Sequence, residues 1–244
     1  MHAPFTRTFD SIDLIANITP SNRAELLAQS HTHHFSKGQG IFFHGQPVQN
    51  FFVLLSGRVK LFRTSENGSV MVVHVASPGE LLLTSAIFSD CISPISAEAM
   101  DDVELLAIPA RLFRQIAARD GQLSYNLLSH LAGNANQYLT QLNQLNLKSV
   151  PQRVGNFILR EFLSTQKQSK TFDLPYDKTT IASHLGMQPE SLSRALQQLR
   201  SNGIDIDRDT ITLPHLFALC DYCDVDTAQR CALHGTADCP NPQC

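Results

Sequence analysis

The stretch from residue 178 to residue 200 constrains the fold of this chain most strongly, because it has the pattern of two helices joined by a tight turn. Its first helix carries three apolar residues on one face: Ile181, Ala182 and Leu185. Gly186 follows directly, where a tight turn requires a left-handed backbone. Pro189 can begin the second helix, because an N–H at that position would have no partner. The sequence therefore predicts a helix-turn-helix whose second helix runs from about Gln188 to Arg200.

The second of these helices has a polar face opposite its apolar one. The apolar face is Leu192, Leu196 and Leu199, and the outward face contains Gln188, Glu190, Ser191, Ser193, Arg194 and Gln197. In a major groove an arginine can donate two hydrogen bonds to guanine, and a glutamate can accept one from cytosine. Thr179 and Thr180, at the start of the first helix, are placed to contact phosphates. We interpret the motif as a DNA-binding site; the alternative is a helical hairpin whose polar face is only solvated.

The residues that follow this motif alternate between apolar and polar types in the stretch IDIDRDTITL, residues 204–213. Such alternation is typical of a small β-hairpin, here with its turn near Arg208 and Asp209. A hairpin directly after a helix-turn-helix would form a wing, which favours the DNA-binding interpretation.

The N-terminal half has a different pattern. Residues 34–110 contain many short β-rich runs separated by Gly, Pro, Ser and Asn, which is typical of an antiparallel sandwich or barrel. Asn67 and Gly68 lie between two such runs and suit the primed two-residue turn of a hairpin. Residues 12–30 instead indicate a short helical segment, with Pro20 at a helix start.

Two interleaved seven-residue repeats run along a long helical stretch from about Gly121 to Ser149. One repeat is Leu128, Ala135 and Leu142, and the other is Leu131, Tyr138 and Leu145. Repeats of this kind indicate a helix that packs along a partner helix. We expect this helix to form a dimer seam; the alternative is one long core helix of a monomer.

Composition excludes several classes of protein. The net charge of −3 argues against general coating of nucleic acid, but the segment 149–219 carries eight basic against seven acidic residues, which permits a local DNA contact.

No apolar run has the length of a membrane span, and the N-terminus lacks the apolar core of a signal peptide. We therefore expect a cytoplasmic protein with reduced thiols and no membrane partner. No G-x-S-x-G, P-loop or H-E-x-x-H motif occurs, so an enzyme is not expected.

Several of these motifs match one family in the order in which that family has them. The matching residues are Lys37–Gly38, Ile41–Phe42, Gly45, 52–57, Val59–Lys60, 78–80, Arg153–Val154 and 190–194. Over residues 10 to about 219 the chain resembles the Crp/Fnr family of bacterial regulators. The resemblance implies an α+β fold with four parts: a β-roll sensor domain (1–118), a dimerisation helix (119–149), a winged helix-turn-helix (150–219) and a cysteine-rich tail (220–244).

The E-x-x-S-R form of the second helix resembles the Fnr and Dnr branches of the family. Proteins of those branches recognise a two-fold TTGAT…ATCAA-like operator, with the glutamate, serine and arginine in contact with bases. The resemblance assigns these roles to Glu190, Ser193 and Arg194. It also implies a homodimer on double-stranded DNA that regulates transcription, as an activator or as a repressor, with RNA polymerase as a further partner.

The signal is a separate question. Cyclic-AMP binders of the family use a second Gly-Glu, where this chain has Leu83-Thr84, and an arginine for the phosphate, which residues 89–99 lack. Burying a cyclic phosphate without a cation is unfavourable, so cyclic AMP is not expected. The N-terminal cluster cysteines of the Fnr branch are also absent, because Cys91 is the first cysteine. We expect Cys91 to be a small buried apolar residue.

Five cysteines crowd into the last 25 residues: Cys220, Cys223, Cys231, Cys239 and Cys244. The first two have the spacing by which a pair of thiolates holds one metal or one edge of a cluster. With so few apolar residues, the tail is expected to need a metal or cross-links to be ordered. We expect a 4Fe-4S iron–sulfur cluster held by four of the five. Its state would change how the acidic tail packs and thereby the affinity for DNA.

Other chemistries remain open for the signal. The tail could hold zinc, with His234 as an extra ligand, or its thiols could switch to disulfides on oxidation. Haem in the sensor domain is a further alternative, suggested by the Dnr-like resemblance and by Cys239-Pro240. The candidate haem ligands are His31, His33, His34, His44 and His74. A histidine within a strand, such as His74, is more often a structural residue.

Overall fold

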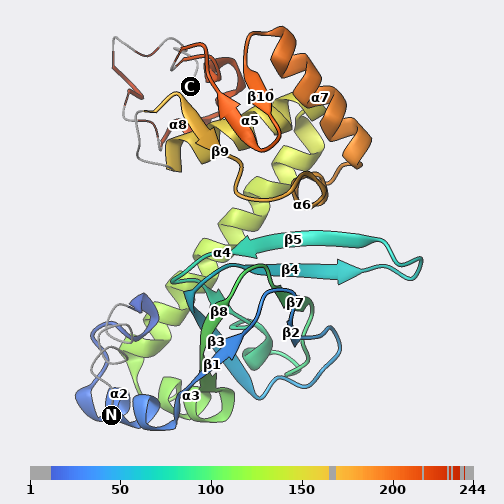
Figure 1. Ribbon diagram of the computed structural model, residues 1–244. Helices are drawn as coiled ribbons and strands as arrows, with labels where there is room; N and C mark the ends of the chain where they lie inside the picture. The colour runs from blue at the N-terminus through green and yellow to red at the C-terminus, as the bar shows by residue number, and fades with distance from the viewer. Residues whose placement is uncertain are drawn as a thin grey trace. The chain divides into compact units, whose positions relative to one another are not determined.

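The computed structural model describes residues 12–164, 169–215, 217–229, 231, 233–236 and 239 of the chain (Figure 1). The chain divides into two compact units, Met1–Asn136 and Gln137–Cys244, and each is described by itself.

Two four-stranded antiparallel sheets form the first unit (Figure 1). One sheet has the order β1-β8-β3-β6, from β1 (His31–Phe35), β8 (Val103–Pro109), β3 (Asn50–Ser56) and β6 (Leu81–Leu82). The other has the order β2-β7-β4-β5, from β2 (Gly40–Phe42), β7 (Ser96–Ala99), β4 (Val59–Thr64) and β5 (Val70–Ala76). Alternating side chains of these strands fill the space between the sheets, which confirms the predicted antiparallel arrangement.

Four short helices belong to the described part of this unit. They are η1 (Asp13–Ile15), α2 (Pro20–Gln29), η2 (Ala86–Phe88) and α3 (Ala110–Ala117). Pro20 is the first residue of α2, as predicted. The fully buried rings of Phe51 on β3 and Phe113 on α3 meet edge to face, with centroids 4.7 Å apart, so α3 is fixed to the roll.

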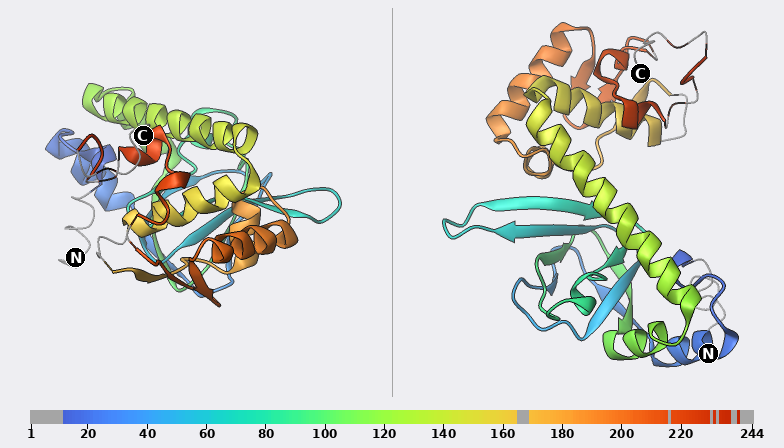
Figure 2. Two further views of the ribbon diagram at one scale, coloured as in Figure 1. Left: turned by 90° about the horizontal axis from the view of Figure 1, so that it is seen from above. Right: turned by 180° about the vertical axis from the view of Figure 1, so that it is seen from behind.

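The hairpin between β4 and β5 extends away from the rest of the roll (Figure 2). The predicted hairpin is confirmed, but its predicted turn type is wrong. A primed two-residue turn needs a positive φ at both central residues, and here only Gly68 has one, at +81°. Gly68 donates its N–H to Ser65 O at 2.9 Å, and Ser65 donates to Ser69 O at the same distance. The loop is therefore longer, with the glycine in the left-handed position that follows an ordinary turn.

α4 (Gly121–Leu147) is the long helix that the heptad pattern predicted. Asp120 caps its first turn, accepting the N–H groups of Gln122 and Leu123 at 3.1 Å each. Leu123 and Leu127 are buried in the core of the first unit, so this part of α4 belongs to the roll.

The second unit is a three-helix core with a small sheet. Its elements are α5 (Val150–Ser164), β9 (Thr171–Asp173), α6 (Lys178–His184), α7 (Pro189–Ser201), β10 (Asp205–Asp207), β11 (Thr210–Thr212), η3 (Cys220–Tyr222) and α8 (Val225–Ala228). The sheet has the order β10-β11-β9 and is antiparallel. Val154 and Ile158 of α5 share one buried cluster with Ile181 of α6 and Leu192 of α7. This arrangement confirms the predicted helix-turn-helix followed by a hairpin.

Candidate DNA-binding surface and cysteine-rich tail

α6 begins at a side-chain cap that also fixes Thr180. Asp177 Oδ1 accepts the Thr180 N–H at 2.9 Å, and Asp177 Oδ2 accepts the Thr180 hydroxyl at 2.8 Å. Burial alone would raise the pKa of Asp177, but the hydrogen bonds from Thr180 and Thr179 hold that pKa below its ordinary value. Thr180 is buried and Thr179 is exposed. The geometry therefore favours Thr179 alone for the phosphate contact that the sequence suggested for both residues.

The turn between α6 and α7 is held from both sides. Gly186 adopts a φ of +62°, as the sequence predicted, and Met187 donates its N–H back to Ala182 O at 2.9 Å. Arg153 of α5 donates from Nη1 to Leu185 O at 2.8 Å, directly before the glycine. The turn angle is therefore fixed by α5 as well as by the local sequence.

α7 separates its side chains into a buried face and an exposed face. Leu192, Ala195, Leu196 and Leu199 are buried. Glu190, Ser193 and Arg194 are exposed, and Gln188 precedes the helix as its exposed N-cap residue. Ser191, which was also predicted to face outward, is only half exposed. The Ser193 hydroxyl donates to the backbone oxygen of Pro189 at 3.0 Å. The helix thus exposes a carboxylate, a hydroxyl and a guanidinium, and groups of these kinds can contact the edges of cytosine and guanine in a major groove.

The wing is short and acidic. β10 and β11 pair through Ile206 and Ile211, both buried, and Arg208 at the turn has a φ of +51°. The turn therefore lies where the alternation predicted it. Asp207 and Asp209 flank this arginine and are exposed, so Arg208 is the cation at the tip of the hairpin.

α4 carries an exposed apolar stripe. Five large residues on it are half or more exposed: Tyr125 (67%), Leu128 (65%), Tyr138 (51%), Leu139 (59%) and Leu142 (54%). Ala135 is exposed as well, but Leu131 is half-buried against the core of the roll, and the side chain of Leu145 lies outside the described residues. Leu128, Tyr138 and Leu142 of this exposed stripe belong to the two predicted seven-residue repeats. Tyr125 and Leu139 also belong to the stripe but not to either repeat.

Among the described residues, no three of the tail cysteines are grouped. Cys220 begins η3, Cys223 follows it as the C-cap residue, and both are half-buried, as are Cys231 and Cys239; Cys244 lies outside the described residues. In the part of the tail that is described, and in the described chain as a whole, no three His, Cys, Asp or Glu side chains are grouped to hold a metal ion. His234 is exposed. The described arrangement therefore does not fit a cluster held by four cysteines.

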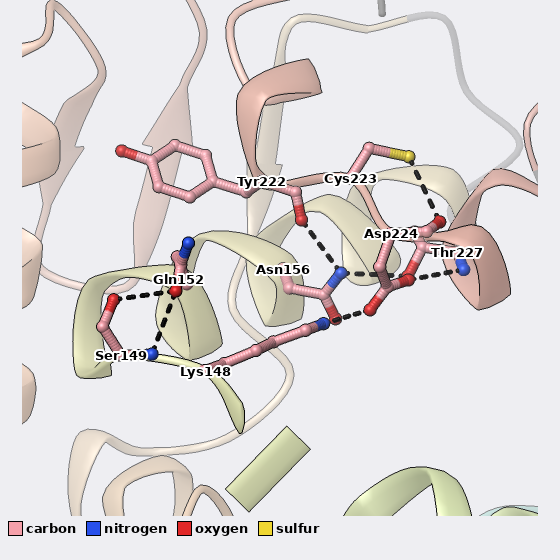
Figure 3. A network of polar contacts seen from close by, with 8 residues as sticks. All are labelled: Lys148, Ser149, Gln152, Asn156, Tyr222, Cys223, Asp224 and Thr227. Atoms are coloured by element: carbon pink, nitrogen blue, oxygen red, sulfur yellow. Dashed lines mark hydrogen bonds and ion pairs between the residues drawn. The ribbon is translucent and has the colours of Figure 1, made fainter. Parts of the chain in front are cut away.

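The first part of the tail is ordered by its own contacts with α5 (Figure 3). Thr227 and Ala228 of α8 are 2% and 1% exposed. The expectation that the tail needs a metal or cross-links to be ordered stays a prediction, and η3 and α8 have protein contacts of their own. The contacts involve Lys148, Gly155 and Asn156, which sequence reasoning missed. A glycine and an asparagine side by side within a helix were the available signal, because both are poor helix formers.

The first unit has polar contacts where the roll meets α4. Thr84 is 3% exposed, and its hydroxyl lies 3.4 Å from His130 Nε2 of α4. Burial lowers the pKa of His130, an effect that the charge of Glu80 opposes. Among the candidate haem ligands, His74 is half-buried and its Nε2 lies 2.6 Å from Glu80 Oε2, which suits a structural role. The others, His31, His33, His34 and His44, are exposed.

Cys91 differs from the expectation of a small buried apolar residue. It is half-buried, it has a φ of +56°, and Arg114 donates from Nη1 to its Sγ at 3.0 Å. No local pattern predicts this guanidinium, because Arg114 lies on α3, more than 20 residues further along the chain.

Comparisons with known proteins agree with both units. Residues 32–120 match a family model described as a cyclic nucleotide-binding domain, and residues 152–222 match the Crp-like helix-turn-helix domain. The anaerobic regulatory protein of Pasteurella multocida is 24% identical over 223 residues, which cover 88% of this chain and 77% of that protein.

Solved structures of regulatory proteins are also similar to this chain. A regulatory protein from Silicibacter pomeroyi DSS-3 is 31% identical, with 88% of this chain and 98% of that chain covered and a TM-score of 0.59. FixK2 from Bradyrhizobium japonicum is 21% identical, covers 80% of this chain and 98% of its own, and has a TM-score of 0.69, which shows a shared fold. Within the described residues, no helix has the length and apolar character to cross a membrane.

Proposed function

This chain belongs to the Crp/Fnr family of transcription regulators, and from that premise we propose that it binds a two-fold TTGAT-like operator as a homodimer in response to a redox or gas signal. The single observation that carries the DNA-binding part is the division of α7 into a buried leucine face and an exposed polar face. A solvated hairpin would not need Arg153 to fix the turn angle between its helices.

The base contacts are assigned to three residues of α7. Arg194 donates to guanine O6 and N7, Glu190 accepts from cytosine N4, and Ser193 contacts a neighbouring base edge. Thr179 contacts a phosphate, which orients α7 without adding sequence preference. Gln188 and Ser191 are the flanking candidates for further contacts.

A homodimer is supported by the apolar stripe on α4. A monomer that left five large apolar side chains of one helix half or more exposed would have a surface typical of an interaction site. A second copy of the same helix provides a matching apolar surface, as in a two-fold dimer. Two recognition helices then address the two halves of a palindromic operator.

The operator test uses the full chain on a duplex with a TTGAT…ATCAA palindrome. Footprinting is run with and without reductant, and a duplex with scrambled half-sites serves as the control. Protection of both half-sites is the expected result. A lack of protection under both conditions would contradict the proposal.

The signal is proposed to be a redox or gas signal that acts at the tail cysteines. The similarity to an anaerobic regulatory protein supports this class of signal, and the spacing of Cys220 and Cys223 suits two thiolates on one iron or zinc. Because the described cysteines are not grouped, a 4Fe-4S cluster would require part of the tail to rearrange.

The cofactor test is anaerobic purification followed by a visible spectrum and by iron, sulfide, zinc and haem analysis. Stoichiometric iron and sulfide that are lost in a Cys220→Ser, Cys223→Ser variant would support a cluster at the tail. A colourless protein with stoichiometric zinc would support the zinc alternative, and haem would move the signal to the sensor unit.

A further inference from the structure

Helix α5 is buried on all sides along part of its length. Its residues 154–159 are all buried, although a helix that packs against one partner keeps an exposed face. Val154 and Ile158 face α6 and α7 in the core of the second unit. Gly155 and Asn156 lie on the other side, where Tyr222 of η3 contacts Gly155 and Thr227 of α8 contacts Asn156. Figure 3 shows Asn156 with Tyr222 and Thr227.

The closest contact of the tail is between Tyr222 and Gly155. A β-carbon built on Gly155 would lie 2.2 Å from Tyr222 Cγ and 2.3 Å from Cδ1. The tyrosine ring therefore lies directly against the backbone of α5, and only glycine leaves room for it. This contact explains why a helix interior tolerates a glycine at this position.

Asn156 holds the backbone and a side chain of the tail at once. Its side-chain Nδ2 donates to Tyr222 O and to Thr227 Oγ1, each at 3.0 Å. Asn156 is 1% exposed and Thr227 is 2% exposed, so these hydrogen bonds are shielded from water. Loss of either partner would leave a buried polar group unsatisfied, which makes the contact specific.

Lys148 adds a charged contact to the same segment. Its Nζ contacts Asp224 Oδ2, and both side chains are about four-fifths buried, at 20% and 21% exposure. Asp224 also caps α8 by accepting the Thr227 N–H at 2.7 Å. Burial alone would raise the pKa of Asp224, but the bonds from Lys148 and Thr227 hold that pKa below its ordinary value.

Tyr222 also reaches the end of α7. Asn202, the C-cap residue of α7, donates from Nδ2 to the Tyr222 hydroxyl at 3.3 Å. One side chain of the tail thus contacts the backbone of α5 with its ring and the C-terminal end of the proposed recognition helix with its hydroxyl.

We infer that residues Cys220–Ala228 form an intramolecular clamp on the DNA-binding unit, and that Tyr222 is a positioning residue for α7. The clamp covers α5 and restrains the C-terminal end of α7, so it sets the orientation in which Glu190 and Arg194 meet DNA. The contacts that hold it come from side chains and backbone groups of this chain. Its effect on DNA binding rests on the proposed function, whereas its docking on α5 does not.

The clamp also gives the tail cysteines a route to the recognition helix. Cys220 is the first residue of η3, Tyr222 is its last, and Cys223 follows as the C-cap residue. A change of state at these thiols would move the residue that contacts both Gly155 and Asn202. The clamp therefore places a signal at Cys220 or Cys223 within two residues of Tyr222, which contacts Asn202 at the end of α7.

Docking is tested by a double-mutant cycle on the full chain. Gly155→Ala places a methyl group against the Tyr222 ring and is expected to lower the midpoint of urea unfolding. Gly133→Ala in α4 is the matched control, because nothing lies within 4 Å of its new β-carbon and its midpoint should stay or rise. Adding Tyr222→Ala to Gly155→Ala is expected to restore the midpoint to that of Tyr222→Ala or above it. If Gly155→Ala behaves like Gly133→Ala, docking is overturned.

Positioning is tested with Tyr222→Phe, which keeps the ring against Gly155 and removes only the hydroxyl. Affinity for the palindrome is expected to fall about threefold, with unchanged affinity for scrambled DNA and an unchanged unfolding midpoint. Asn202→Ala should give the same loss, and the double variant should lose no more than either single variant.

Equal palindrome affinities for wild type and Tyr222→Phe would overturn the positioning role. Failure of the wild type to prefer the palindrome would instead count against the proposed function, and the double-mutant cycle would still decide docking.

Discussion

Arg153 Nη1 of α5 donates a hydrogen bond to the carbonyl oxygen of Leu185 at 2.8 Å, across 32 residues of sequence. Leu185 directly precedes Gly186, the residue at which the chain turns from α6 to α7. A guanidinium therefore satisfies a carbonyl at the end of α6 and joins α5 to the turn that sets the direction of the recognition helix.

Removal of this hydrogen bond should weaken both stability and DNA binding. Arg153→Met keeps the length of the side chain and loses the donor, so the free energy of unfolding should fall by about 1.5 kcal/mol. Palindrome affinity should fall together with it, because the turn angle is no longer fixed from α5. Urea unfolding followed by far-UV circular dichroism and fluorescence anisotropy with a labelled duplex measure the two effects.

Arg63→Met is the matched control for this experiment. Arg63 Nη1 also donates to a backbone carbonyl, that of Pro94, at 2.9 Å, but the pair is exposed and lies in the other unit. Loss of the Arg63 hydrogen bond should change neither the free energy of unfolding nor the free energy of DNA binding by more than a few tenths of a kcal/mol. Similar effects of the two substitutions would argue against a special role for the Arg153 contact.

Charge on the apolar stripe of α4 should separate the proposed dimer. Leu128→Glu and Leu139→Glu each place a carboxylate where an apolar side chain is more than half exposed in the single chain. Each substitution occurs twice in a two-fold dimer, so the dissociation constant should rise about 100-fold or more. Sedimentation equilibrium over a range of protein concentrations measures it.

Asn136→Glu provides the control for the stripe, since Asn136 is an exposed polar residue of the same helix. That variant should dimerise like the wild type. A wild-type chain that sediments as a monomer at all concentrations, or a Leu128→Glu variant that still dimerises normally, is incompatible with the proposed seam.

Asp120 should give the first unit a stability that depends on acid pH. The hydrogen bond from Asn22 Nδ2, at 2.8 Å, is the main reason why the pKa of Asp120 lies below its ordinary value, helped by N–H groups of Leu123, Thr19 and Gln122. A carboxyl whose pKa is lower in the folded state stabilises the fold above its unfolded pKa of about 3.9. That contribution is lost as the pH falls through the lower folded value.

Asp120→Asn removes the charge and its titration together. At pH 7 the variant should be less stable than the wild type by about 1 kcal/mol, since the cap of α4 is weakened. Between pH 7 and pH 3 the variant should lose less stability than the wild type does. Urea midpoints at several pH values measure both, and equal losses for the two proteins would show that Asp120 does not contribute.

The elements with strong local patterns were predictable from the sequence. The spacing of Ile181, Gly186 and Pro189 predicted the helix-turn-helix, and the alternation around Arg208 predicted the hairpin after it. Both depend on neighbours within a few residues, so local rules suffice. The long helix α4 was predictable for the same reason.

Contacts between distant segments were not predictable. The sequence assigned phosphate contacts to both Thr179 and Thr180, and only the structure shows that Asp177 already holds Thr180. Likewise, Tyr222 and Gly155 are 67 positions apart, and no local pattern joins them. The expectation for the tail rested on its cysteines and its low apolar content. Neither feature predicts the buried contacts of α8, because these depend on a few specific residues far apart in the sequence.

The central claim is that α7 recognises bases through Arg194, and a base-substitution titration tests it most directly. Affinity is measured by anisotropy for the TTGAT…ATCAA palindrome and for a palindrome in which each half-site guanine, with its paired cytosine, is exchanged. Wild-type protein should prefer the first duplex by about 1–3 kcal/mol per half-site, and Arg194→Ala should lose most of that preference while keeping its unfolding midpoint. Wild-type protein that binds both duplexes equally, or an Arg194→Ala variant that keeps the full preference, would contradict the account.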